Sequence, residues 1–120
     1  MRGERYLTKP KQYELVYDKG SSWANSLLVM KALPNGLALS RYGFSVGKRV
    51  GRAVIRNRVK RRLREIMRLM SLLPGWDIMF IVRPAAATAG YAELKGAVAD
   101  LLSKARLLNR EHEAICLKAY

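Results

Sequence analysis

The spacing of apolar residues predicts two central elements of this chain. Between Ile55 and Met70, apolar residues recur at intervals of four, four, three and four positions, which is the period of one face of an α-helix. The helix should end by Leu73, because a Pro-Gly pair follows it. The almost continuously apolar run 77–82 is bounded by turn signals, and such a run predicts a short strand near the centre of a sheet.

The first half of the chain predicts a helix followed by a hairpin. Thr8 can cap a helix with Pro10 in its first turn, where the missing N–H costs nothing. A strand over 27–30, a Pro-Asn-Gly turn and a second arm over 37–46 then predict two paired strands. Gly43 within the second arm indicates a bend or the close approach of a partner.

The last part of the chain predicts one more helix and an unassigned tail. Thr88 can cap a helix with one apolar face, formed by Tyr91, Leu94, Val98, Leu101, Leu102 and Ala105. The predicted order is helix, strand, strand, helix, strand, helix, an α/β (α+β) two-layer sandwich. We expect one domain over 1–120, with its core in 7–106 and no assigned structure for 107–120.

Charge favours a polyanionic partner. The chain carries 23 Lys and Arg against 9 Asp and Glu, a formal charge of +14 and a pI near 10.5, so it should repel itself unless an anion neutralises it. A membrane surface is the rival to nucleic acid, but the chain lacks an apolar run of about 20 residues, a signal-peptide pattern and a lipidation signal. A cytoplasmic RNA- or DNA-binding protein is therefore expected, and its single cysteine fits a reducing compartment.

The strongest concentration of charge falls on the predicted basic helix. Ten Lys or Arg residues lie between Lys48 and Arg68, against Glu65 as the single acid. At 100° per residue the apolar positions form a narrow stripe and the cations spread over the opposite half. The stripe should anchor the helix, and the basic half should bind phosphates. A solvated helix face usually mixes charges of both signs, whereas this one does not.

Residues 42–65 closely resemble the signature of the bacterial ribonuclease P protein subunit. The motif Arg56-Asn57-Arg58 stands between a strand ending in Ser-Val-x-Lys and a helix continuing as Lys-Arg-x-x-Arg. The resemblance covers about residues 5 to 106, through the aromatic positions of a first helix, a Ser-x-Ala-Asn turn at 22–25 and a strand ending in Arg-Pro. It implies a mixed sheet of about four strands, with a left-handed βαβ crossover through the basic helix, as in a ribosomal-protein domain.

The resemblance also implies a function. In that family the protein assists a catalytic RNA, which removes the 5′ leader of precursor tRNA and leaves a 5′-phosphate on the mature tRNA. The RNA, and not the protein, holds the magnesium ions of the reaction. The implied RNA-binding residues of the basic helix are Arg52, Arg56, Asn57, Arg58, Lys60, Arg61, Arg62, Arg64 and Arg68. The implied leader-cleft residues are Tyr13, Tyr17, Ser45, Lys48 and Arg49. The implied partners are the catalytic RNA, in a 1:1 complex with monomeric protein, and the leader.

Simpler interpretations stand beside these assignments. By spacing alone Tyr13 and Tyr17 are core packing, and Asn57 could bridge locally instead of touching RNA. Lys31 occupies a sheet position where the family often has an aromatic residue. His112 and Cys116 lie at helical spacing, but two ligands without a third predict no metal site.

Two other functions compete with the preferred hypothesis. A ribosomal or ribosome-associated structural protein would share the small basic α/β sandwich. An autonomous metal-dependent nuclease would need an acidic or histidine cluster, and the scattered carboxylates provide no catalytic pair. We therefore expect no catalytic and no metal-binding residue in the protein itself.

Overall fold

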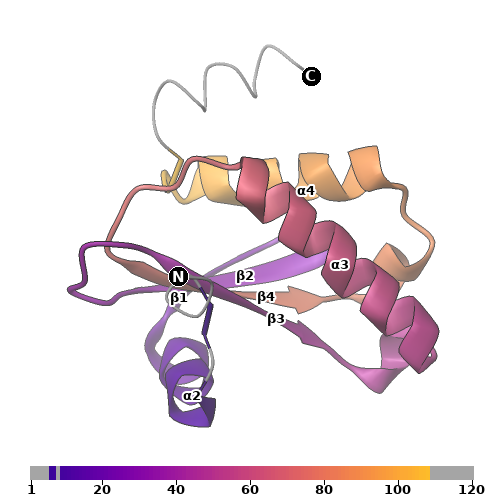
Figure 1. Cartoon of the computed structure of the whole chain (residues 1–120), viewed down its shortest axis with the longest axis horizontal. Coiled ribbons are helices and arrows are strands. Elements are labelled where there is room, and N and C mark those ends of the chain that lie inside the picture. Colours follow the sequence, from indigo (N-terminus) through magenta and orange to yellow (C-terminus); the bar gives the residue numbers. More distant parts are fainter. Residues whose placement is uncertain (1–5, 8, 109–120) are drawn as a thin grey trace.

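The computed structural model describes residues 6, 7 and 9–108 and contains four strands, three α-helices and two short 3₁₀ turns within them (Figure 1). In chain order these are α2 (Pro10–Lys19), β1 (Ser21–Ala24), β2 (Leu28–Pro34), β3 (Arg41–Val46), η1 (Lys48–Val50), α3 (Ala53–Leu69), β4 (Trp76–Val82), η2 (Pro84–Ala87) and α4 (Tyr91–Lys104).

The strands form one mixed sheet in the order β1-β2-β4-β3. β2 is antiparallel to both β1 and β4, and β3 is parallel to β4. β4 therefore lies inside the sheet, as its continuous apolar sequence predicts. Seen from the side of α3 with the strands pointing up, β4 lies to the left of β3, so the crossover through α3 is left-handed (Figure 1).

The hairpin prediction is wrong, because β2 and β3 are separated by β4. Asn35 does form a turn, accepting a hydrogen bond from the Leu37 N–H at 2.8 Å. Its own N–H, however, donates to Gly75 O at 2.8 Å, and its Nδ2 donates to Asp77 Oδ1 at 2.9 Å. These bonds tie the end of β2 to the beginning of β4, and the chain crosses to the far edge before β3 begins.

β1 is not predicted from the sequence, and the turn expected at Ser22–Asn25 is only partly correct. β1 is a four-residue edge strand with three exposed residues, so it lacks the apolar alternation that would have revealed it. Asn25 makes the turn that follows, since its Oδ1 accepts hydrogen bonds from the N–H groups of Leu27 and Leu28 at 3.1 and 3.0 Å. The turn thus lies after a strand that pairs with β2.

The two faces of the sheet are covered differently. α3 and α4 lie on one face, and α2 lies on the other (Figure 1). The main core fills the space between the sheet and the α3–α4 pair, with Leu28, Met30 and Phe80 fully buried. A smaller cluster beneath α2 contains Val16 and Met79. The alternation of side chains along each strand supplies both clusters.

The helix boundaries differ in detail from those predicted. α3 begins at Ala53, after η1, and ends at Leu69, so Lys48 and Arg49 precede the helix. Gly51 lies between η1 and α3 and has a φ of 151°. This backbone conformation favours glycine. α4 is capped at Gly90 and not at Thr88, whose hydroxyl donates to Ala85 O at 3.4 Å.

The end of the described chain packs onto the core. Leu107 and Leu108 are buried, and Leu108 pairs with Leu72 in an isolated antiparallel bridge. Part of the segment left unassigned by sequence therefore belongs to the folded body. Thr8, His112 and Cys116 lie outside the described residues.

Candidate nucleic-acid interface

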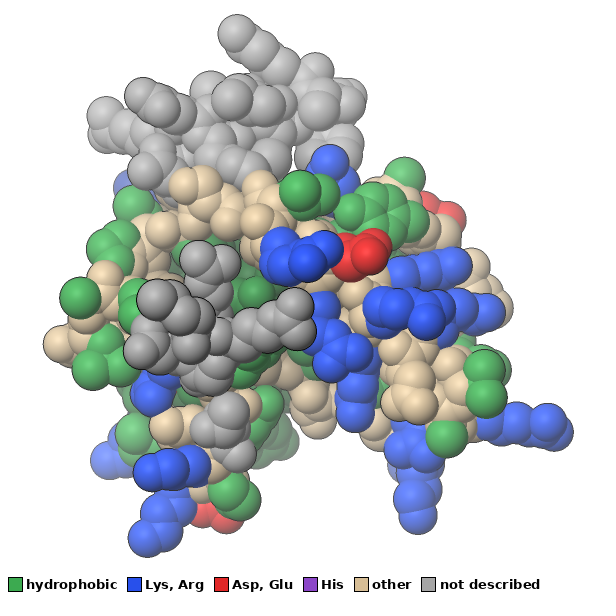
Figure 2. Space-filling view, in the orientation of Figure 1, with side chains coloured by type: hydrophobic (Ala, Val, Ile, Leu, Met, Phe, Trp, Pro, Cys, Tyr) green, Lys and Arg blue, Asp and Glu red, His purple; other side chains and the backbone are tan. Residues whose placement is uncertain are grey.

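α3 combines a buried stripe with an exposed basic surface. Val59, Leu63 and Ile66 are fully buried, as the spacing predicts, and Met67 joins them. The exposed polar positions turn to the opposite side, and they are Arg52, Asn57, Arg61, Arg64, Glu65 and Arg68, of which Glu65 alone is acidic. Figure 2 shows Lys and Arg side chains gathered over this part of the molecule. The arrangement fits contact with a chain of phosphates.

Two arginines of α3 face the protein instead. Arg58 Nη2 donates to Ala87 O at 3.1 Å, and Arg62 Nη1 donates to Ala89 O at 3.1 Å. Both side chains are half-buried, and they tie α3 to η2 and to the segment that follows it. The sequence could not separate them from Arg61 and Arg64, because all four lie outside the apolar stripe.

The flank of α3 on the other side of the stripe is also basic. Arg56 and Lys60 are half-buried there. Among the described residues the Nε atoms of Arg56 and Arg58 are buried without a hydrogen-bond partner. Buried donors without a partner are uncommon in folded proteins.

The beginning of α3 concentrates positive potential. Lys48 and Arg49 are exposed on η1, and Arg52 is exposed at the N-cap position. The first turn contains no acidic residue, although an acid there would favourably oppose the helix dipole. Free N–H groups and cations together attract an anion to this end of the helix.

The tyrosines of α2 lie on the opposite face of the sheet and differ from each other. The Tyr13 hydroxyl donates to Leu7 O at 2.8 Å, and burial raises the pKa of Tyr13, which keeps the hydroxyl neutral. Its ring lies against Gly43, where a Cβ atom would overlap it. The close approach indicated by Gly43 is thus made by Tyr13 of the same chain. Tyr13 contributes packing here, as spacing alone indicates.

Tyr17 is the accessible aromatic residue of this face. Its side chain is 55% exposed, and the Lys31 Nζ lies 4.4 Å from the ring centroid in a cation–π contact. The same Nζ donates to Tyr17 O at 3.2 Å. Lys31 therefore places a cation beside the ring instead of a second aromatic. The sequence flagged Lys31 as a departure but did not indicate this pairing.

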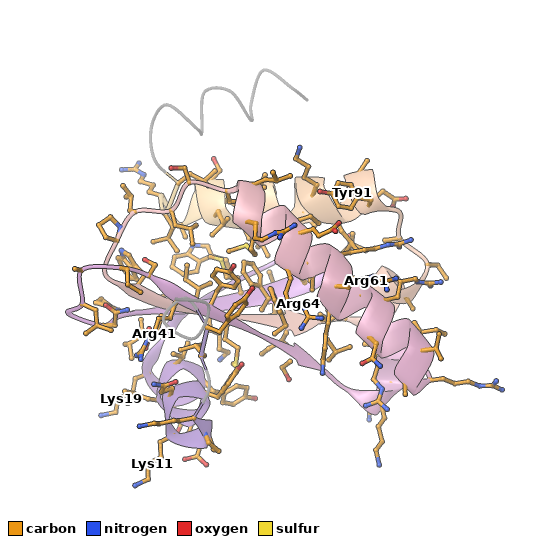
Figure 3. The ribbon with its side chains drawn as sticks, viewed as in Figure 1. Lys11, Lys19, Arg41, Arg61, Arg64 and Tyr91 are labelled. Atoms are coloured by element: carbon orange, nitrogen blue, oxygen red, sulfur yellow. The ribbon has the colours of Figure 1, made fainter. Side chains whose placement is uncertain are left out.

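The other predicted leader residues lie along β3 and beyond it. Ser45 is exposed and follows Gly43 on the same face, since alternate residues of a strand point the same way. Figure 3 shows Lys11 and Lys19 projecting from α2, on the other side of the sheet from Arg61 and Arg64 of α3. The described residues thus carry two basic surfaces on opposite faces of one sheet.

The described residues contain no group of three or more His, Cys, Asp or Glu side chains able to hold a metal ion. No described helix is long and apolar enough to cross a membrane. The fold and the two surfaces define a small basic α/β protein that binds nucleic acid.

Comparisons with known proteins give the family. The ribonuclease P family model matches residues 1–106, and the chain belongs to the family of ribonuclease P protein components. It is 47% identical over 119 residues to the ribonuclease P protein component of Dehalococcoides mccartyi, covering 99% of each chain. The corresponding protein of Roseiflexus castenholzii is 44% identical, over 82% of this chain and 84% of that protein.

Solved structures agree with this family. A Staphylococcus aureus RNase P protein mutant, described as defective in mRNA degradation activity, superposes with a TM-score of 0.85 at 30% identity, covering 90% of this chain and 93% of that one. The Thermotoga maritima RNase P protein gives a TM-score of 0.74 at 27% identity, covering 82% and 96%. The chain is accordingly an RNA-binding subunit of the ribonuclease P holoenzyme, which processes tRNA, and the ribosomal alternative is not favoured.

Proposed function

We propose that this subunit holds the 5′ leader of precursor tRNA on the sheet face that carries α2, while α3 binds the ribonuclease P RNA. The RNA cleaves one phosphodiester, releasing the leader and leaving a 5′-phosphate on the tRNA. One protein monomer binds one RNA, and the complex works in the cytoplasm on newly made precursor tRNA. The Mg²⁺ ions of the reaction are held by the RNA and the substrate.

The observation that carries this proposal is the separation of the two surfaces. The exposed cations of α3 lie on one side of the sheet, and Tyr17 with Lys31 lies on the other. A protein that bridges a structured RNA and a single-stranded leader needs two such surfaces. A protein that only fills a site within one folded RNA has no need for the second.

The Tyr17–Lys31 pair suits a leader of variable sequence. Single strands are bound by basic grooves with aromatic platforms, and stacking contributes about 1 to 3 kcal/mol per base with little sequence selectivity. Lys31 covers part of the Tyr17 ring and brings a cation for the neighbouring phosphate, and the exposed remainder of the ring is available to a base. Ser45 adds a hydroxyl on the same face.

The basic surface also lowers the concentration of Mg²⁺ that the holoenzyme requires. RNA and precursor tRNA repel one another, and cations must neutralise both before they meet. A subunit of charge +14 supplies fixed positive charge at the junction. Less free Mg²⁺ is then needed to bring the substrate and the catalytic RNA together.

The leader part of the proposal is tested by comparing the affinity of the holoenzyme for precursor and for mature tRNA. Tyr17→Ala should reduce the preference for precursor about 5- to 100-fold, as expected for one lost stacked base, whereas Tyr17→Phe should retain it. Leu15→Ala is the matched control, since Leu15 is exposed on the same helix but points away from Tyr17. An unchanged preference for precursor tRNA in Tyr17→Ala would contradict binding of the leader to this face of the sheet.

A further inference from the structure

A large groove lies between α3 and the segment that leads into β3, away from the α2 face. Its volume is about 1070 Å³. The floor is apolar and includes Tyr42 and Met67, both nearly inaccessible to solvent. Tyr6 stands beside Tyr42 in an edge-to-face contact, with ring centroids 5.1 Å apart. The accessible apolar surface of the groove therefore comes from lining residues that are not buried, among them Tyr6, Leu39 and Leu72.

The α3 rim of the groove is strongly basic. Arg61, Arg64 and Arg68 line it, with Glu65 as the only acid among the lining residues. Figure 3 shows Arg61 and Arg64 projecting from α3. Within residues 6, 7 and 9–108, these three arginines make no ion pair or hydrogen bond with the protein. Their guanidinium groups are available to an anionic ligand.

The opposite rim is held in place by the protein. Ser40 accepts a hydrogen bond from the Trp76 N–H at 3.0 Å and donates to Leu73 O at 2.5 Å. Asn35 Nδ2 donates to Leu39 O at 3.3 Å. These bonds fix residues 38–40 against the chain that enters β4, so the groove is already open before a ligand binds, which lowers the ordering cost of binding.

We propose that this groove binds a single-stranded segment of the ribonuclease P RNA, with one unstacked base inserted over the apolar floor and its flanking phosphates on Arg61, Arg64 and Arg68. Arg61 and Arg68 are seven residues apart and are therefore separated by about 10 Å along the helix axis, a distance that an RNA segment with more than one phosphate can span. A base has flat apolar faces that stack on an accessible aromatic ring such as that of Tyr6. The inference rests on the proposed function and adds a second single-strand site, distinct from the one for the leader.

Two kinds of variant separate the roles of the floor and the rim. Ala38→Trp fills the groove from the fixed rim without changing charge, and Arg64→Gln with Arg68→Gln removes charge without filling it. The controls are Ala85→Trp at an exposed position outside the groove and Lys95→Gln on α4. The measurements are the affinity for the catalytic RNA against salt concentration, and chemical probing of that RNA with and without protein.

Ala38→Trp should weaken binding at least about tenfold and restore the reactivity of one single-stranded RNA segment, while the salt slope stays unchanged. The double arginine variant should lower the log–log salt slope by about 1.4 to 1.8. Wild-type affinity and an unchanged footprint for Ala38→Trp would overturn the inference, because the arginines would then act from the helix surface alone.

Two further measurements keep these outcomes distinguishable. Thermal melting checks the fold of each variant, and Ser71→Trp fills the groove from another lining position if Ala38→Trp does not fold. The preference of the holoenzyme for precursor over mature tRNA, measured with the wild-type protein, tests the proposed function separately. If the wild-type holoenzyme prefers precursor tRNA but Ala38→Trp leaves the RNA footprint unchanged, only the proposed groove site is refuted. If the wild-type holoenzyme shows no preference for precursor tRNA, the proposed leader surface is refuted.

Discussion

At the scale of single residues, the least expected feature is a buried charged cluster at the beginning of β4. Asp77 is 5% exposed and is the one buried charged side chain among the described residues. Arg41 Nε donates to its Oδ1 at 2.8 Å and Arg41 Nη2 to its Oδ2 at 2.7 Å, and Asn35 adds a third bond. The hydrogen bond to this carboxylate raises the pKa of Arg41, so the guanidinium group stays charged. The cluster fixes the register of β3 against β4.

Asp77→Ala should reduce the free energy of unfolding by about 2 to 4 kcal/mol. It leaves the Arg41 guanidinium without its partner, although the 21% exposure of that side chain moderates the loss. Chemical denaturation measures the change. Lys104→Ala is the control, because it breaks an exposed pair with Asp100 at 3.1 Å and should cost about 0 to 1 kcal/mol. Equal losses in the two variants would contradict a structural role for Asp77.

Gly43→Ala should also destabilise the fold, by about 1 to 3 kcal/mol. The new Cβ atom would overlap the Tyr13 ring, whereas the same change at Gly47 meets nothing within 4 Å and should be nearly neutral. In a Tyr13→Ala background the cost of Gly43→Ala should largely disappear. Denaturation of the double-mutant cycle measures this coupling, and strict additivity would contradict the contact.

At the scale of elements, α3 performs two tasks with one kind of side chain. Arg61 is exposed, whereas Arg62 donates to Ala89 O and holds the segment that leads into α4. Neighbouring arginines thus face solvent and protein, respectively. Successive residues of an α-helix are rotated by about 100°. Arg62 therefore points toward the segment that follows η2, whereas Arg61 points into solvent.

Arg61→Ala should therefore lower the log–log salt slope of RNA binding by about 0.7 to 0.9 and leave thermal stability within about 0.5 kcal/mol. Arg62→Ala should instead cost about 1 kcal/mol of stability through the lost hydrogen bond, with a smaller effect on the slope. Filter binding across a salt series and thermal melting measure the two effects. The same slope change in both variants would show that Arg62 also contacts phosphate.

The elements also show what sequence could and could not predict. α3 and β4 were predictable because their own apolar patterns decide their burial. The pairing of β2 with β4 was not, because it depends on bonds from Asn35 to Gly75 and Asp77, far along the chain. For the site, the spacing of apolar residues predicted the exposed basic surface of α3. The Lys31–Tyr17 contact and the inward direction of Arg58 and Arg62 were not predictable, because they depend on how distant segments pack together.

At the scale of the whole molecule, net charge limits stability as well as function. A formal charge of +14 on 120 residues produces self-repulsion in the compact state. The described residues contain only two ion pairs, Arg41–Asp77 and Lys104–Asp100, so little of this charge is neutralised internally. The free protein is therefore adapted to a state in which RNA supplies the counter-charge.

The melting temperature of the free protein should rise by several degrees between about 20 mM and 500 mM salt. At the higher concentration the Debye length falls from about 20 Å to about 4 Å, and repulsion between surface cations is screened. Sulfate should raise the melting temperature more than chloride at equal ionic strength, because it is also excluded from apolar surface. Scanning calorimetry measures both series. A salt-independent melting temperature would contradict the importance of self-repulsion.

The central claim is that this protein makes a catalytic RNA effective on precursor tRNA. The most direct test is cleavage of precursor tRNA by a bacterial ribonuclease P RNA at low Mg²⁺, with and without the protein, with the cut site mapped. We predict strong, protein-dependent cleavage at the mature 5′ end and no cleavage by the protein alone. Cleavage that is equally slow with and without the protein, despite tight RNA binding, would contradict the account.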